Sequence, residues 1–176
     1  MTNFWIPIAD ADDRGRGLFL RHYSAHHYQD RRRRTKFIGP GQYIALLTLG
    51  CDALFVWRKF IDKSGQQGIN CSIFRNEGRI QSSRLIIEAD NLAWQRWPGE
   101  RLYTYVNPGK IRSTNPGYCF KMAGWRICGI TKKRKLLILE MLPEWTHFPT
   151  DSPLDNTHLE SLSTQSLGYS IKFKAI

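Results

Sequence analysis

The stretch from Cys71 to Gly129 constrains the fold most, because strand-like and helix-like patterns alternate along it. Residues 69–74 are largely apolar and lead into the turn residues Arg75-Asn76-Glu77-Gly78, as expected of a strand followed by a turn. Ser82 and Ser83 are typical N-cap residues, and apolar residues recur after them at helical spacing. Another strand-like segment follows that helix. A strand–helix–strand unit of this length favours parallel pairing and an α/β fold.

The other segments complete one domain. Before the central stretch, the patterns predict a helix from Asp10–Asp13 towards His22 and an antiparallel hairpin of strands 43–49 and 53–61. Within it, they predict a strand over 101–106 and a helix capped by Asn115 and ended by Gly124. Two further strands are predicted over 126–131 and 136–140. The sequence therefore predicts a mixed α/β (α+β) sheet of about six strands flanked by helices over residues 1–142, with residues 1–8 as a short leader. Residues 143–176 are expected to form a loop-rich C-terminal tail whose end could add an edge strand.

The net charge favours a polyanionic partner. Lys and Arg number 26 against 15 Asp and Glu, which gives +11. The densest positive run comprises Arg31, Arg32, Arg33, Arg34 and Lys36, and we expect it to hold DNA or RNA through phosphates without reading sequence. A merely basic soluble domain is the alternative. No segment matches a membrane span or a signal peptide, so a cytoplasmic protein without a membrane partner is expected.

The cysteines and histidines leave metal binding open. The four cysteines form no C-x-x-C pair, and Cys71, Cys119 and Cys128 lie among apolar neighbours, which favours free buried thiols over a zinc site. His22 and His26 are four residues apart, so on a continuous helix they would share a face and could hold a metal ion. The sequence does not identify a third ligand.

The segment Arg75-x-x-Gly78-x-Ile80 resembles the R/Q-x-x-G-x-G/A loop of the GNAT acyltransferases, although Ile80 replaces the last small residue. In that family, the loop after the fourth strand holds the pyrophosphate of the donor at a helix N-terminus, where free N–H groups and the helix dipole attract phosphate. The resemblance implies a GNAT-like fold and acetyl-CoA or another acyl-type donor. The expected donor-binding residues are Arg75, Asn76, Gly78, Ser82, Ser83 and Asn115. A second segment, 120–125, resembles a GNAT motif but places Phe120 where that family often has a tyrosine general acid.

A His-Tyr pair ahead of a GNAT-like core, in a basic protein, resembles the Mom family of phage proteins. His22 and Tyr23 match that pair. The resemblance implies modification of the amino group of adenine in DNA, as protection against restriction, and iron linked to the pair, with His22 as a metal ligand. Tyr105 and Asn107 sit at the end of the fifth strand, where the fourth and fifth strands of a GNAT-like sheet splay apart. The expected catalytic residues are therefore His22, Tyr23, Tyr105 and Asn107.

Two other functions stay open at this stage. One is an acyl- or aminoacyl-transferase acting on a small amine, RNA or a protein, which the altered loop from Arg75 to Ile80 would allow. The other is a non-catalytic nucleic-acid-binding module on a GNAT-like fold, which the missing tyrosine at Phe120 favours and the polar residues around Arg75 and Asn115 disfavour. Tyr118 is expected to pack over the sheet rather than replace that tyrosine.

Overall fold

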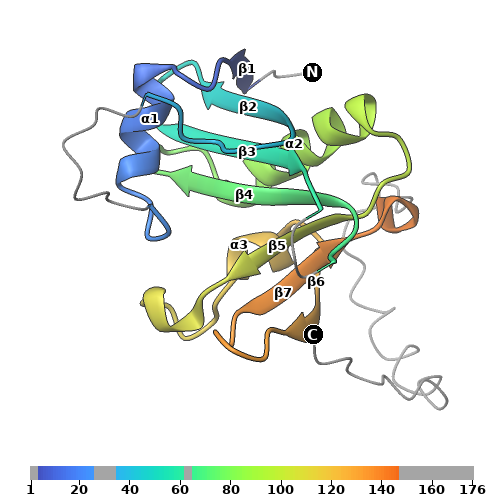
Figure 1. Cartoon of the computed structure of the whole chain (residues 1–176). Coiled ribbons are helices and arrows are strands. Elements are labelled where there is room, and N and C mark those ends of the chain that lie inside the picture. The colour runs from blue at the N-terminus through green and yellow to red at the C-terminus, as the bar shows by residue number, and fades with distance from the viewer. Residues whose placement is uncertain (1–3, 26–34, 62–64, 147–176) are drawn as a thin grey trace, which may run out of the picture.

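The computed structural model describes residues 4–25, 35–61 and 65–146 (Figure 1). Within these ranges, the chain forms one seven-stranded mixed sheet in the order β1-β2-β3-β4-β5-β7-β6. The strands are β1 (Trp5–Ile8), β2 (Gln42–Thr48), β3 (Ala53–Lys59), β4 (Ile69–Asn76), β5 (Leu102–Val106), β6 (Arg126–Ile130) and β7 (Leu137–Met141). The helices are α1 (Asp13–Leu20), α2 (Ser82–Arg96) and α3 (Tyr118–Met122), with short 3-10 helices η1 (Pro108–Lys110) and η2 (Pro143–Thr146).

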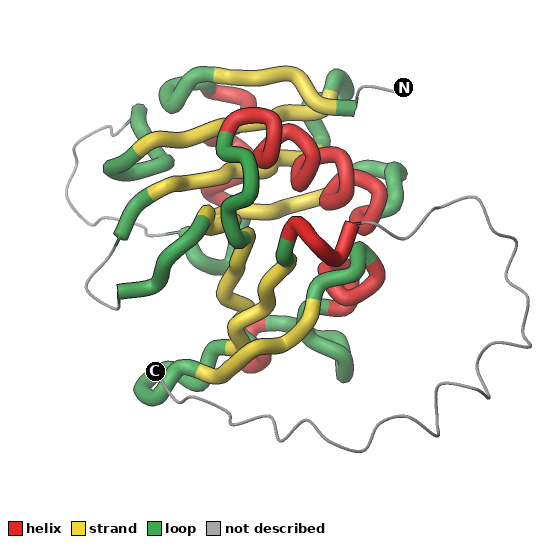
Figure 2. The backbone as a smooth tube through the Cα atoms, turned by 90° about the vertical axis from the view of Figure 1, so that its right-hand side faces the viewer, coloured by secondary structure: helices red, strands yellow, loops and turns green. Residues whose placement is uncertain are grey.

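Helices cover both faces of the sheet, which explains why the sequence of β3 is almost entirely apolar. Phe55 and Trp57 belong to the core under α2 and α3, whereas Leu54 and Val56 belong to the core under α1. Because successive side chains of a strand point to opposite faces, a strand buried on both faces has to be apolar throughout. Figure 2 shows α2 lying along one face of the strands.

The sheet consists of two halves joined by a short parallel pair. Strands β1 to β4 are antiparallel neighbours, which we call the first half, and β5, β7 and β6 form an antiparallel second half. Between the halves, β4 and β5 pair in parallel from Ile69–Leu102 only as far as Cys71–Thr104. Both strands continue beyond this point without pairing with each other.

A β-bulge lies where the pairing of β4 with β5 ends. Opposite β3, Cys71 pairs with Trp57 and Ile73 pairs with Val56, so Ser72 is the extra residue of β4. A bulge bends its strand, increases the local twist and interrupts a ladder. Ser72 therefore marks the position from which β4 bends away from β5.

The prediction of a mixed α/β fold is confirmed, but the sheet has seven strands rather than six. The additional strand is β1, where the sequence predicted a leader. Trp5 opposes Thr48 of β2, is only 2% exposed, and donates a hydrogen bond from its indole nitrogen to the carbonyl of Leu85 at 2.9 Å. A strand of four residues that includes Pro7 carries too little periodicity to be recognised without these tertiary contacts.

The predicted helix caps are wrong in two places. Gln81 is the N-cap of α2 and makes no side-chain capping bond, while Ser82 and Ser83 are the first two helical residues. The hydroxyl of Ser82 instead accepts a hydrogen bond from Asn76 at 3.0 Å. Asn115 does not cap α3, because Gly117 precedes the first turn with φ of 75°.

Two other boundaries also differ from the sequence prediction. Arg75 and Asn76 are the last residues of β4, paired with Leu54 and Ala53, and not the start of a turn. At the other end, the predicted tail begins with η2, whose Trp145 packs against the core and under the guanidinium of Arg126 at 4.3 Å. The possible edge strand over 168–176 lies outside the described residues.

Candidate functional site

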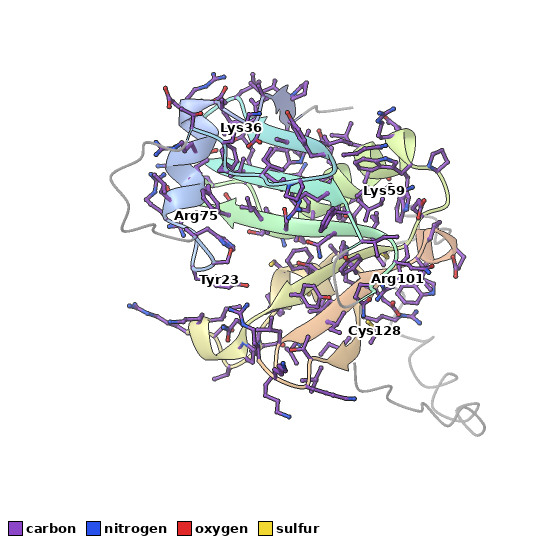
Figure 3. All side chains as sticks on the ribbon, viewed as in Figure 1. Tyr23, Lys36, Lys59, Arg75, Arg101 and Cys128 are labelled. Carbon is purple, nitrogen blue, oxygen red and sulfur yellow. The ribbon has the colours of Figure 1, made fainter. Side chains whose placement is uncertain are left out.

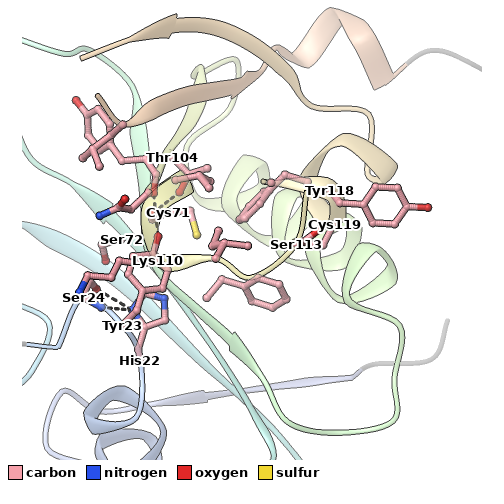
Figure 4. Close-up of a pocket in the computed structure, with 18 of the residues that line it drawn as sticks. His22, Tyr23, Ser24, Cys71, Ser72, Thr104, Lys110, Ser113, Tyr118 and Cys119 are labelled. Atoms are coloured by element: carbon pink, nitrogen blue, oxygen red, sulfur yellow. Dashed lines mark hydrogen bonds between the residues drawn. The ribbon is translucent and has the colours of Figure 1, made fainter. Parts of the chain in front are cut away.

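A cavity of about 600 Å³ lies where β4 and β5 part (Figure 4). Its lining comes from the turn after α1, from both diverging strands, from the β5–α3 loop (residues 107–117) with the start of α3, and from the β6–β7 turn (residues 131–136). All four residues that the sequence predicted to be catalytic border it, namely His22, Tyr23, Tyr105 and Asn107. The divergence of the strands thus brings together segments that are more than 80 residues apart in the sequence.

The turn after α1 bridges the two diverging strands. The His22 ring lies beside the backbone of Phe74 in β4, which acts to raise the pKa of the ring. The Tyr23 hydroxyl donates a long hydrogen bond of 3.5 Å to the carbonyl oxygen of Tyr105 in β5 and lies beside the backbone of Asn107. The two rings pack with centroids 4.4 Å apart. One residue of the pair is therefore tied to β4 and the other to β5, and Figure 3 shows Tyr23 pointing towards the second half of the sheet.

The hydrogen bonds around His22 assign its tautomer. The Ser24 backbone N–H donates to Nδ1 at 3.3 Å, and the Ser24 hydroxyl lies 2.7 Å from the same nitrogen (Figure 4). Because a backbone N–H can only donate, Nδ1 is the acceptor and the ring proton is on Nε2. Ser24, which sequence reasoning missed, is thus the direct partner of His22. Its position two residues after the histidine was the only signal.

Burial sets the protonation of the aromatic pair. It lowers the pKa of His22 to about 4, and the nearby charge of Arg75 acts in the same direction. It raises the pKa of the Tyr23 hydroxyl above its usual value, against the opposing effect of the Asn107 hydrogen bond. Near neutral pH, the site therefore presents a neutral imidazole and a protonated phenol.

The cysteines of the cavity are thiols rather than thiolates. Cys71 and Cys119 both line it, and burial raises the pKa of each sulfur. The prediction of free cysteines is confirmed at all four positions, but only Cys71 is fully buried. A thiol that stays protonated at neutral pH is a weak nucleophile. The chemistry of this cavity therefore rests on its hydroxyl, imidazole and amide groups.

Arg75, one of the residues expected to bind the donor, already has hydrogen-bonding partners within the protein. The guanidinium of Arg75 donates to the Glu77 carboxylate and to the backbone carbonyl of Arg21. Arg21 donates twice to the same carboxylate at 2.8 Å, and these hydrogen bonds hold the pKa of Glu77 at about 2. Arg75 thus fastens the end of β4 to the end of α1 (Figure 3).

The close approach of Asp52 requires a glycine at position 78. A Cβ atom built there would lie 2.2 Å from Oδ2 of Asp52, so any other residue would collide with that carboxylate. The N–H of Gly78 donates to Oδ1 of Asn76 at 2.9 Å, and the N–H of Glu77 donates to the carbonyl of Asp52 at 2.8 Å. These two amides of the expected phosphate loop are therefore already paired, with the carboxylates of Asp52 and Glu77 close by.

The other donor-binding candidates divide between the cavity and the core. Asn115 lines the cavity and accepts a hydrogen bond from Lys121, whereas Ser83 is buried in α2. Arg75, Asn76, Gly78 and Ser82 do not line the cavity.

Two aromatic residues of α3 have different environments. Phe120 is buried against Phe74 and Trp125, with ring centroids 5.8 Å and 5.0 Å away, so no acid stands at this position. Tyr118 was expected to pack over the sheet, which is wrong: it is 55% exposed and borders the cavity. On a short helix, residues two apart point in different directions, which turns Tyr118 outward when Phe120 is buried.

The described donors do not complete a metal site. Among residues 4–25, 35–61 and 65–146, no three His, Cys, Asp or Glu side chains lie together as metal ligands would. Nδ1 of His22 already has hydrogen-bonding partners, and α1 ends at Leu20, before His22. His26 lies outside the described residues. The described side chains around His22 therefore do not fit iron.

The predicted nucleic-acid-binding run is only partly visible. Lys36 is exposed, while Arg31, Arg32, Arg33 and Arg34 lie outside the described residues. In the part of the chain that the structure describes, no helix has the length and apolar character needed to cross a membrane.

Searches against protein-family models, curated proteins and solved structures found no match to this chain.

Proposed function

We propose that this protein is a GNAT-type transferase that modifies the amino group of adenine in DNA with acetyl-CoA or another acyl-type donor, as the resemblance to the Mom family implies. The observation that carries the proposal is the single cavity bordered by His22, Tyr23, Tyr105 and Asn107. Its volume of about 600 Å³ lies in the range of small-molecule sites and would admit a base flipped out of a duplex.

The sheet supports the proposal. With β1 included, the strand that ends at Asn76 is the fourth and the strand that ends at Val106 is the fifth. These two strands are the parallel pair that separates after Cys71–Thr104, as expected from the GNAT resemblance. The cavity occupies the site of this separation, where the acyl group of a donor and an acceptor amine could meet.

The chemistry sets three demands on the site. The amine of adenine is uncharged but a poor nucleophile, so it must be held in line with the carbonyl of the donor. That carbonyl must be polarised, and the leaving group must receive a proton. We assign the polarisation to the backbone amides of β4 just beyond Cys71, where β5 no longer pairs with the strand.

Side chains of the turn after α1 accept the proton of the amine and donate a proton to the leaving group. As the new C–N bond forms and the bond to the leaving group breaks, the amine loses a proton. The Ser24 hydroxyl takes that proton while passing its own to Nδ1 of His22, 2.7 Å away. Tyr23 retains its proton at neutral pH and donates it to the leaving group. The proton on His22 then returns to Tyr23 through solvent.

Mass spectrometry of nucleosides tests the function directly. DNA is isolated from cells expressing the protein, from cells expressing His22→Ala, and from cells expressing Tyr43→Phe as a control at an exposed residue that does not line the cavity. We expect a heavier deoxyadenosine with the unaltered protein and with the control, and at least a hundredfold less with His22→Ala, in the range of a lost acid–base catalyst. Only unmodified deoxyadenosine, from cells containing folded protein, would overturn the proposal.

A second candidate follows from the paired amides of Glu77 and Gly78. Because two amides of this loop are already paired and would have to give up their partners to bind a pyrophosphate, the loop favours a donor other than acetyl-CoA, or a non-catalytic module that binds nucleic acid. With another donor, such as an aminoacyl group, the acceptor could be RNA, a small amine or a protein. Melting in the presence of acetyl-CoA separates these cases from the first.

A further inference from the structure

The positive charge of this protein is concentrated in one segment. Residues 101–139 contain nine Lys and Arg and no Asp or Glu, whereas the remainder has seventeen Lys and Arg against fifteen Asp and Glu. This segment forms β5, α3, β6 and most of β7, which means that it builds the second half of the sheet. The charge of the molecule is therefore strongly asymmetric, and the arginine run at 31–34 is not its main source.

Three of the nine cationic side chains already have a partner within the protein. Arg101 donates to the Glu140 carboxylate at 2.6 Å, Lys121 donates to the Asn115 amide, and Arg126 lies over the Trp145 ring. The remaining six are exposed residues of two connections, the β5–α3 loop and the β6–β7 turn: Lys110, Arg112, Lys132, Lys133, Arg134 and Lys135. Within the described ranges, none of the six forms an ion pair.

The two connections meet at the cavity. Lys110 and Arg134 both line it, one from each connection, together with Tyr105 and Ser24. Figure 1 shows η1 and the β6–β7 turn at the same end of the second half of the sheet. Like charges that border one cavity repel one another in the absence of an anion, and a polyanion bound there would relieve this repulsion.

We propose that these six cations form a phosphate-binding surface that holds the backbone of a nucleic acid across the mouth of the cavity. This inference rests on the proposed function and identifies the face that the substrate occupies. The six charges lie on two connections that each place one cation, Lys110 or Arg134, at the cavity, which suits a chain of regularly spaced phosphates beside one extruded base. Tyr118, exposed at the same rim, supplies a ring on which a neighbouring base can stack.

Salt-dependent binding tests the surface. A labelled duplex of about 20 base pairs is titrated by fluorescence anisotropy at several salt concentrations with the unaltered protein, with Lys110→Gln/Arg134→Gln, and with Arg84→Gln/Arg96→Gln. The last pair removes the same charge from exposed positions of α2. Loss of two phosphate contacts should weaken binding by roughly ten- to a hundredfold near 0.15 M salt and reduce the slope of log K against log salt by about 2. The α2 variant should retain most of the affinity and the slope.

Several outcomes would overturn the surface. Equal weakening in both double variants would mean that only net charge matters, and unchanged binding in Lys110→Gln/Arg134→Gln would place DNA elsewhere. If that variant instead loses binding to acetyl-CoA, or to phosphatidylserine vesicles, while DNA binding is intact, the cations serve the donor or a membrane.

The nucleoside assay keeps this result separate from the proposed function. Modified deoxyadenosine at wild-type levels in cells expressing Lys110→Gln/Arg134→Gln, with unchanged DNA binding, would disprove the surface and leave the function standing. Salt-sensitive DNA binding that depends on Lys110 and Arg134, without any modified deoxyadenosine, would support the surface and disprove the proposed function.

Discussion

Ser24 and His22 form the pair on which the proposed proton transfer depends. The Ser24 hydroxyl is 2.7 Å from Nδ1 of His22, and the ring lies beside the backbone of Phe74. A base that is oriented by a third group and hydrogen-bonded to a hydroxyl is the usual arrangement for moving a proton. The pair is small, partly exposed and local to one turn, so it can be altered without disturbing the core.

Substitution of Ser24 tests this role. Ser24→Ala should lower the rate of modification by about ten- to a hundredfold, because the amine would have to pass its proton to His22 without the hydroxyl. Ser24→Thr keeps the hydroxyl and should restore most of the rate. Rates of purified variants on duplex DNA, measured across pH, would show the change. Equal activity of Ser24→Ala and the unaltered protein at every pH would remove Ser24 from the mechanism.

The low pKa of His22 makes stability depend on pH. In the folded protein this pKa is about 4, below the value of 6.5 that an unperturbed histidine has. Between these values the unfolded chain binds more protons at this position than the folded protein does, so the His22 contribution is complete above pH 6.5 and is lost as pH falls towards 4. The free energy of unfolding should therefore fall less between pH 7 and pH 4.5 in His22→Gln than in the unaltered protein.

Urea unfolding at a series of pH values measures this difference. Other titrating groups act in both proteins and cancel when one curve is subtracted from the other. If the free energies of unfolding of the two proteins fell in parallel with pH, the pKa of His22 would not be lowered in the folded protein.

At the scale of elements, the β4–α2 loop is held by its contact with the β2–β3 hairpin. Gly78 accommodates the carboxylate of Asp52, and Gly78→Ala would place a methyl group 2.2 Å from its oxygen. We expect this substitution to destabilise the fold by about 1–3 kcal/mol, as is usual for overpacking. Asp52→Ser removes the obstructing carboxylate, so Gly78→Ala should cost clearly less in that background. Chemical unfolding of all four members of this double-mutant cycle gives the coupling, and additive effects would contradict the packing explanation.

Local patterns predicted the elements whose burial follows one simple period. Helix α2 and the β2–β3 hairpin were expected nearly at their observed bounds, because Leu85, Ile86 and Ala89 repeat at helical spacing and the strands are continuous apolar runs. The start of α2 was misplaced because the Ser82 hydroxyl bonds to Asn76, six residues away, and not to the first turn. The strand β1 was missed because its stability comes from the contact of Trp5 with α2.

The candidate site was predictable only in part, and for a related reason. The proximity of His22 and Tyr23 to Tyr105 came from a family resemblance, since no spacing rule connects residues 82 apart. Lys110 and Arg134 could not be assigned to a common site until the fold brought two separate connections to one cavity. The absence of acidic residues over 101–139 is visible in the sequence, but its meaning depends on the sheet.

At the scale of the whole molecule, the cavity lies at the junction of two half-sheets. The halves share three parallel residue pairs, the hydrogen bond from Thr104 to the carbonyl of Cys71 at 2.9 Å, and the packing of α3 against α2. A ligand that touches the diverging ends of β4 and β5 at once adds contacts across this short junction. Filling the cavity should therefore stabilise the fold as a whole, and not one half of it.

Acetyl-CoA is the ligand that tests this expectation and separates the candidate functions. At a hundredfold excess over its dissociation constant, it should stabilise the protein by about 2.7 kcal/mol and raise the melting temperature by roughly 5–10 °C for a domain of this size. Ser72→Trp, which places a large ring at the bulge inside the cavity, should abolish the shift if its own melting remains cooperative. A shift with DNA but none with millimolar acetyl-CoA would favour a different donor or a non-catalytic binding module. Since the amides of Glu77 and Gly78 are already paired, such a result would show that this loop does not open to admit a pyrophosphate.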